Sequence, residues 1–255
     1  VLALVITGIT LLRGDEAGPA PGASSSVVPS VTSSATGSAM PSPASSPGNP
    51  GSTFRFQPLW PFASVADAAA WQAEALPNGS QPWRLDPAQT ALTFASTHLG
   101  STEMNRVTSR QIVGDEAWIG VAGTPPEGRT VSAAVLHLAR IGVGPLDGRP
   151  WEVVGSRDTL LTLTTPRYGS VVGHTIVIGG RISGVDESLV IQVRDHAGTV
   201  LARRQGIPAG GVETPWQVTL TLPSGSAGLV TIAVSTGGHI ADVEHREPIG
   251  VVLPG

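Results

Sequence analysis

An alternation of apolar and polar residues runs through the C-terminal part of the chain, between Thr159 and Leu253. In Ser188–Arg194 every second residue is a leucine, isoleucine or valine, and the run from Trp216 to Leu222 alternates in the same way. A period of two is typical of a β-strand with one buried face. About seven such runs follow one another at intervals of roughly 8–12 residues, separated by glycine, proline or aspartate. This pattern predicts an all-β sandwich over residues 158–255.

Trp216 stands at the start of one of these runs, in phase with Val218 and Leu220, and it is the only tryptophan of residues 158–255. We therefore expect it to be the central aromatic residue of the sandwich core. The alternative is an exposed tryptophan on which a carbohydrate ring stacks.

Residues 54–157 combine helix signals with strand signals. Ser64 and Asp67 form a capping box ahead of an alanine-rich run, and Asp86 followed by Pro87 is a second helix start. Strands are expected after the helices, at Val107–Val113, Ala117–Ala122, Thr130–Ile141 and Trp151–Gly155. Helices followed by an antiparallel sheet predict an α+β domain, with helices packed on a curved sheet.

The N-terminal residues 1–13 are apolar as far as Leu12. Because about 20 apolar residues are needed to cross a bilayer, we interpret them as the C-terminal part of a transmembrane or signal-anchor helix. A signal peptide is the alternative, but no A-x-A-like cleavage site follows closely. Residues 14–53 are rich in serine, proline, alanine and glycine and have no periodicity, which predicts a disordered linker.

Composition excludes several classes of site. The formal net charge of −4 argues against a nucleic-acid partner, because binding to a phosphate backbone requires a basic surface. The absence of cysteine excludes disulfides, thiolate nucleophiles and cysteine-ligated zinc. No hydrolase G-x-S-x-G, metalloprotease H-E-x-x-H or phosphate-binding glycine motif occurs in the sequence. We therefore expect no catalytic residues and no cofactor.

His239, Asp242 and His245 are the best candidates for metal ligands. On a strand, however, the two histidines share a face and the aspartate points to the other one. Polar residues at the surface of an edge strand are the favoured interpretation, and we expect no metal site.

A ligand pocket is the remaining possibility in residues 54–157. Trp118, His137 and Trp151 lie on predicted strands and could line a concave sheet face around one titratable group. The alternative is that both tryptophans belong to the core and that the histidine has a structural role.

Two motifs stand out in the C-terminal part: Thr165–Val172 contains Pro-x-x-Gly-x-x-Val, and Arg194–Leu201 reads Arg-Asp-x-x-Gly-x-Val-Leu. A Ser-x-x-Gly sequence follows at Ser235–Gly238. Over about 95 residues, these segments resemble the opening, the hairpin and a turn of the Gmad-type bacterial immunoglobulin-like module, which is associated with sporulation and germination proteins. The resemblance implies an immunoglobulin-like fold in an exported or envelope protein, with no catalytic residues.

The preceding part ends in Pro150–Val154, which resembles the closing strand of the NTF2-like or cystatin-like α+β family. The order of anchor, linker, α+β domain and immunoglobulin-like module also resembles that of uncharacterised actinobacterial membrane proteins.

Together these features predict a non-catalytic, single-pass protein of the cell membrane, with its folded domains outside the cytoplasm. Its expected partners are the membrane, through the N-terminal segment, and either a cell-wall polymer or another envelope protein. Two alternatives remain: the extracytoplasmic sensor part of a transmembrane signalling protein, or a small-ligand binder that uses residues 54–157.

Overall fold

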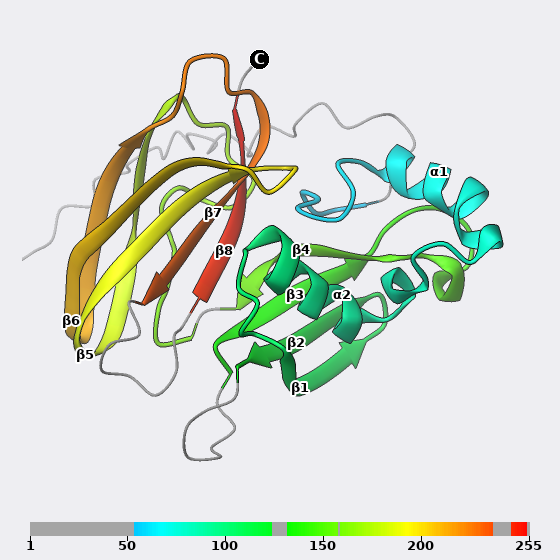
Figure 1. The fold of residues 1–255 in the computed structure, drawn as a ribbon, viewed down its shortest axis with the longest axis horizontal. Coiled ribbons are helices and arrows are strands. Elements are labelled where there is room, and N and C mark those ends of the chain that lie inside the picture. The colour runs from blue at the N-terminus through cyan, green and yellow to red at the C-terminus, as the bar shows by residue number, and fades with distance from the viewer. Residues whose placement is uncertain (1–53, 124–131, 158, 237–245, 254–255) are drawn as a thin grey trace, which may run out of the picture. The chain divides into compact units, whose positions relative to one another are not determined.

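Two four-stranded antiparallel sheets and a few short helices make up a mostly β fold (Figure 1). The computed structural model describes residues 54–123, 132–157, 159–236 and 246–253 of the 255-residue chain. The predicted anchor and linker lie outside these residues, and so do His239, Asp242 and His245. In the described ranges, no helix combines the length and the apolar character that crossing a bilayer requires.

The first sheet has the strand order β1-β2-β3-β4, so that each strand pairs with its neighbour in the sequence. Its strands are β1 (Arg106–Val113), β2 (Glu116–Ala122), β3 (Ala134–Arg140) and β4 (Trp151–Arg157). The positions agree closely with the predicted strands, because the alternation of apolar residues sets both the period and the limits of each one.

Helices precede this sheet in the sequence, and the predicted caps form. The Ser64 hydroxyl accepts a hydrogen bond from the Asp67 amide (3.1 Å), and Asp86 accepts one from the Ala88 amide (2.7 Å). These elements are α1 (Val65–Glu74), α2 (Pro87–Thr93) and three short helical turns: η1 (Leu76–Asn78), η2 (Pro82–Leu85) and the π-helical η3 (Phe94–His98). A further short turn, η4 (Leu146–Gly148), lies between β3 and β4.

The α2 helix and the η3 turn pack on one face of the first sheet. The buried cluster there combines helix residues with sheet residues and includes Ala91, Phe94, Ile119, Leu136 and Val153. Burial of this apolar face supplies the main stabilisation of both layers, since a short helix is marginal by itself.

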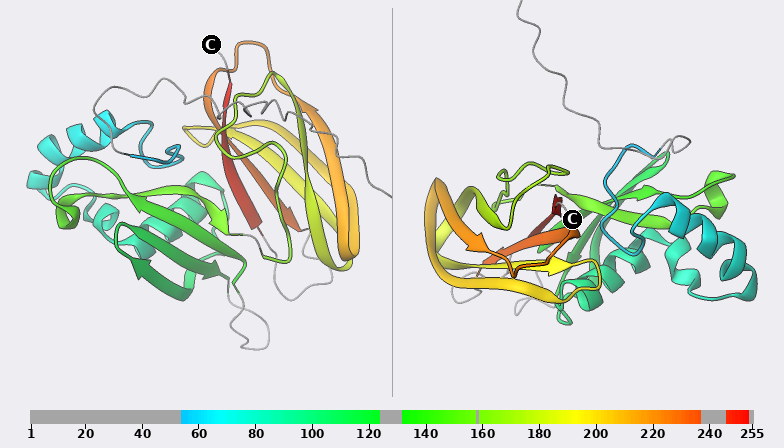
Figure 2. Two further views of the ribbon diagram at one scale, coloured as in Figure 1. Left: turned by 180° about the vertical axis from the view of Figure 1, so that it is seen from behind. Right: turned by 90° about the horizontal axis from the view of Figure 1, so that it is seen from above.

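The second sheet has the order β6-β5-β7-β8. Its strands are β5 (Thr175–Asp195), β6 (Val200–Thr221), β7 (Gly228–Thr236) and β8 (Arg246–Leu253). The sequence pattern divides β5 and β6 into two runs each, whereas the structure makes each a continuous strand of 21 and 22 residues with several register shifts. Such irregularities bend a strand, and β5 and β6 are visibly curved (Figure 2).

The bend lets both halves of β5 contribute to one core. Ile176 and Ile178 from the first half belong to the same buried cluster as Ile191 and Val193 from the second half. Trp216 is also part of this cluster and is 5% exposed, which confirms its predicted place in the core.

Both sheets belong to the same compact unit of the chain. His98 of η3 contacts the second sheet, where its Nε2 lies 3.0 Å from the Thr231 hydroxyl of β7. The His98 ring stacks on Phe94 and is 1% exposed. Burial, followed by repulsion from His196 and Arg194, lowers the pKa of His98 to about 4, although Asp195 acts in the opposite direction.

Replacement of Trp216 by alanine should destabilise the second sheet strongly. We expect a loss of about 3–5 kcal/mol in the free energy of unfolding, because a large buried ring is removed from the core. Urea unfolding followed by circular dichroism measures this loss. The control is Val212→Ala on the same strand, where the side chain is 87% exposed and the change should stay within about 0.5 kcal/mol. Equal effects of the two substitutions would contradict the packing described.

The low pKa of His98 should make stability depend on pH. Between pH 6.5 and about 4 the unfolded chain binds a proton at this histidine and the folded chain does not, so acidification favours unfolding. The free energy of unfolding is therefore highest above pH 6.5 and falls as the pH decreases towards 4, by at most roughly 3 kcal/mol. Urea unfolding of the wild type and of His98→Gln, at pH values from 4 to 7.5, measures the difference between the two stabilities. Parallel pH profiles would show that His98 is not the group responsible.

Candidate functional site

The structure brings two of the three predicted pocket residues together. Trp118 of β2 and His137 of β3 are cross-strand partners, and their rings stack with centroids 4.9 Å apart and an interplanar angle of 2°. Trp151 is 1% exposed and belongs to the cluster beneath α2, on the other face of the sheet. The predicted set therefore does not line one cavity, and whether any of the three contacts a ligand stays a prediction.

The surroundings of His137 fix its ring in place. Its Nε2 lies 2.7 Å from Oε2 of Glu116, the edge of its ring meets Phe56, and Trp118 covers one face. Glu116 also forms an ion pair with Arg55. Burial lowers the pKa of His137, and the hydrogen bond to Glu116 opposes this effect. The result is an ordered group of side chains that holds Arg55 beside the first sheet.

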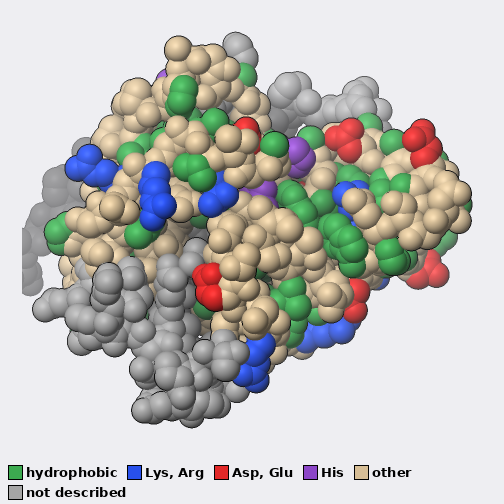
Figure 3. Space-filling model, viewed as in Figure 1, with side chains coloured by type: hydrophobic (Ala, Val, Ile, Leu, Met, Phe, Trp, Pro, Cys, Tyr) green, Lys and Arg blue, Asp and Glu red, His purple; other side chains and the backbone are tan. Residues whose placement is uncertain are grey.

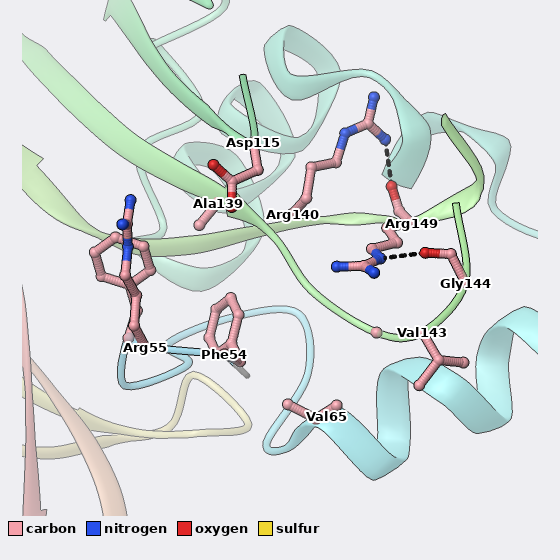
Figure 4. A pocket seen from close by; sticks show the side chains of 11 residues that line it. Phe54, Arg55, Val65, Asp115, Ala139, Arg140, Val143, Gly144 and Arg149 are labelled. Atoms are coloured by element: carbon pink, nitrogen blue, oxygen red, sulfur yellow. Dashed lines mark hydrogen bonds between the residues drawn. The ribbon is translucent and has the colours of Figure 1, made fainter. Parts of the chain in front are cut away.

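A cleft of about 350 Å³ opens next to this group, at the end of the first sheet (Figure 4). One wall is the segment at residues 54–56, and another is the loop at residues 142–149. The start of α1, the turn between β1 and β2 and the end of β3 complete the lining. The lining residues are Phe54, Arg55, Phe56, Val65, Asp115, Ala139, Arg140, Gly142, Val143, Gly144 and Arg149.

Gln72 of α1 holds the loop at residues 142–149. Its side-chain amide donates to the carbonyls of Val143 and Gly148, both at 2.9 Å, and its Oε1 accepts from the Val143 amide at 2.9 Å. Gly142 has a φ of +101°, and a Cβ at this position would overlap Gln72 Oε1. Glycine is therefore required for the loop to approach α1 so closely.

Three arginines line the cleft in different ways, and Figure 4 shows the guanidinium of Arg140 directed away from Phe54 and Arg55. Arg149 donates through Nε to the Gly144 carbonyl at 2.8 Å, and Figure 4 shows its guanidinium directed into the cleft. Arg140 donates to the Arg149 carbonyl and lies 4.3 Å above the Trp151 ring. Arg55 is paired with Glu116. Within the described part of the chain, no carboxylate lies within ion-pair distance of Arg140 or Arg149.

Asp115 is the one carboxylate among the lining residues, and its side chain is exposed. Burial lowers the pKa of Arg140, with a smaller opposing effect of Asp147, but a guanidinium keeps its charge at any physiological pH. The cleft therefore presents more positive than negative charge, beside a wall that contains two phenylalanine side chains.

Sequence patterns do not mark the arginines of the cleft as a site. Arg55, Arg140 and Arg149 come from three separate segments and form no motif with a fixed spacing. The only local signal is the Gly142-Val143-Gly144 segment between two arginines, which resembles any glycine-containing loop.

Glu152 of β4 is the other notable ionisable group. It is completely buried, and its carboxyl accepts a hydrogen bond from the Phe62 amide at 3.0 Å. Burial raises its pKa well above the usual value, and hydrogen bonds together with the nearby Arg84 oppose this effect only in part. The contact fixes the segment that leads to the cleft wall, so we assign Glu152 a structural role.

The described residues include no cluster of metal ligands, and the face in Figure 3 shows no extended apolar surface. Across the residues that the structure describes, no three histidine, aspartate or glutamate side chains come close enough to hold a metal ion. On the face shown in Figure 3, hydrophobic side chains lie in small groups among polar and backbone atoms. The cleft is therefore the strongest candidate for a binding site.

Comparisons with known proteins give little further information. Neither a family model nor a curated protein matches the chain. A solved structure that does match is the neutron crystallographic structure of a Jonesia denitrificans lytic polysaccharide monooxygenase, with 15% identity and a TM-score of 0.24. The match covers 34% of this chain and spans 59% of the length of the monooxygenase chain. A similarity at this level supports no argument about fold or activity.

Replacement of Gln72 by alanine should release the loop at residues 142–149. Three hydrogen bonds are lost, so we expect the free energy of unfolding to fall by about 1–3 kcal/mol. The Val143 amide should also exchange faster with deuterium, because Gln72 Oε1 is its acceptor. Gln89→Ala on the exposed face of α2 is the control and should change neither quantity. If the exchange rate of the Val143 amide is the same in the Gln72 variant, Gln72 does not hold the loop at residues 142–149.

Proposed function

We propose that this chain is a non-catalytic, membrane-anchored protein of the cell envelope that binds a wall polymer or another envelope protein. The cleft at the end of the first sheet is the observation that carries the proposal, because it combines a preformed cavity with fixed charges. The apolar residues 1–13 and the serine- and proline-rich residues 14–53 support the anchored, extracytoplasmic arrangement.

In this proposal, residues 54–157 are an α+β domain of NTF2-like or cystatin-like type, and residues 158–255 are an immunoglobulin-like sandwich of Gmad type. The packing of α2 and η3 on one face of the first sheet supports the α+β assignment. The single core shared by both halves of β5 supports the sandwich assignment. The second domain then provides a rigid support, and the first domain provides the binding cleft.

The dimensions of the cleft favour a small ligand or one unit of a polymer. Its volume of about 350 Å³ is at the lower end of the range of about 300–1,000 Å³ that small-molecule sites occupy. The lining consists of arginines, phenylalanines, small residues and one aspartate, which supply charge, shape and hydrogen bonds. This composition is suited to recognition, and we assign no reaction to it.

Binding to isolated cell walls tests the proposal. The full chain should co-sediment with purified bacterial wall sacculi, and Arg149→Ala should weaken binding about tenfold, because one charge-assisted contact is lost. Arg203→Ala is the matched control, since Arg203 is an exposed arginine of β6 that does not line the cleft. If the wild type does not sediment with the walls, or if both variants lose binding equally, the proposed function is wrong.

A further inference from the structure

We propose that the cleft selects an acidic saccharide, a sugar unit that carries a carboxylate or a phosphate, by placing the oxyanion on Arg149. This inference rests on the proposed binding function and names the class of ligand.

The charge of the cleft favours an anion. Arg55, Arg140 and Arg149 line it together with a single carboxylate, Asp115. Two further acids lie nearby: Glu116, which is engaged by Arg55 and His137, and Asp147, whose charge acts on Arg140. In the described parts of the chain, Arg140 and Arg149 have no ion-pair partner, so a bound anion would not have to displace one.

Arg149 is held in position before a ligand arrives. Its Nε is used by the Gly144 carbonyl, which leaves the edge formed by the two terminal nitrogens directed into the cleft (Figure 4). This edge matches the spacing of two oxygens of a carboxylate or phosphate. Gln72 fixes the loop that carries the arginine, and a fixed side chain loses little conformational entropy on binding.

The wall opposite the loop is aromatic. Phe54 and Phe56 contact each other edge to face, with centroids 5.9 Å apart, and the Arg55 guanidinium lies 4.9 Å from the centre of the Phe56 ring. An aromatic face accommodates the apolar C–H face of a sugar ring, whereas an inorganic anion gains nothing from it. The ligand is therefore expected to be an anionic group attached to a ring.

Asp115 restricts the distribution of charge on the ligand. Its carboxylate lines the same cleft, where it accepts hydrogen bonds from hydroxyl groups and repels a second anion. A ligand with one oxyanion and several hydroxyls satisfies both Arg149 and Asp115. A compact polyanion such as a polyphosphate does not.

Binding of defined saccharides to the full chain tests the inference. The probes are galacturonate against its neutral methyl ester, and glucose 6-phosphate against glucose, so that carboxylate and phosphate are tested separately. We expect one charged probe to bind at least tenfold more tightly than its neutral counterpart. In Arg149→Gln this preference should fall by about 10-fold to 100-fold, because the charge-assisted bidentate contact is lost.

Two further variants keep the test independent of folding. Arg149→Lys retains the charge without the two-pronged edge, so it should recover only part of the preference. Arg203→Gln should bind like the wild type, and an unchanged melting temperature of each Arg149 variant excludes a loss of fold.

The outcomes separate the inference from the proposed function. Equal affinity for charged and neutral probes, reduced together in Arg149→Gln, would overturn the anion selection and leave the cleft as a binding site. Sedimentation with cell walls that depends on Arg149, without binding of either charged probe, would also overturn the acidic-saccharide inference alone. Failure to bind both the walls and all four probes would overturn both.

Discussion

The attachment of residues 59–62 to β4 is the constraint on which the arrangement of the candidate site depends. The Leu59 amide donates to the Val153 carbonyl (3.0 Å), and the Val153 amide donates to the Trp60 carbonyl (2.8 Å). The carboxyl of Glu152, the residue before Val153, accepts a hydrogen bond from the Phe62 amide. These bonds satisfy an edge of the first sheet and fix the direction of the preceding residues, so that Phe54 and Arg55 form a wall of the cleft.

Burial of the Glu152 carboxyl has a free-energy cost that the surroundings offset only in part. The group is removed from water, which favours its protonated form and raises its pKa. Arg84 lies near it and packs against the rings of Phe62 and Trp71, at 4.5 Å and 5.6 Å from their centres. A polar group enclosed in this way specifies one arrangement of the segment, since an alternative packing would leave the carboxyl without its donor.

The same segment also reaches the second sheet. Leu59 is fully buried and packs against Gly250 of β8, where a Cβ would overlap its side chain. His196 lies with Nδ1 3.1 Å from the Leu59 carbonyl, and His98 contacts Thr231. The segment that forms one wall of the cleft is therefore held by both sheets, and this rigidity is consistent with a site that is prepared before its ligand binds.

Local sequence determined the elements of this protein, and tertiary structure decided which of them meet. The alternation of apolar residues indicated where the strands lie, although it divided β5 and β6 into two runs each. The capping residues Ser64 and Asp86 marked the helix starts, and the phase of Trp216 assigned it to the core, because each of these signals depends on neighbours in the sequence. The pairing of β3 with β4 shifts by one residue between His137 and Leu138. Trp151 lies on the face of the sheet opposite Trp118. The three arginines of the cleft converge only because residues 54–62 attach to β4 and Gln72 holds the loop at residues 142–149. Contacts between residues so far apart in the chain leave no periodicity, so the binding site could be found only in the folded structure.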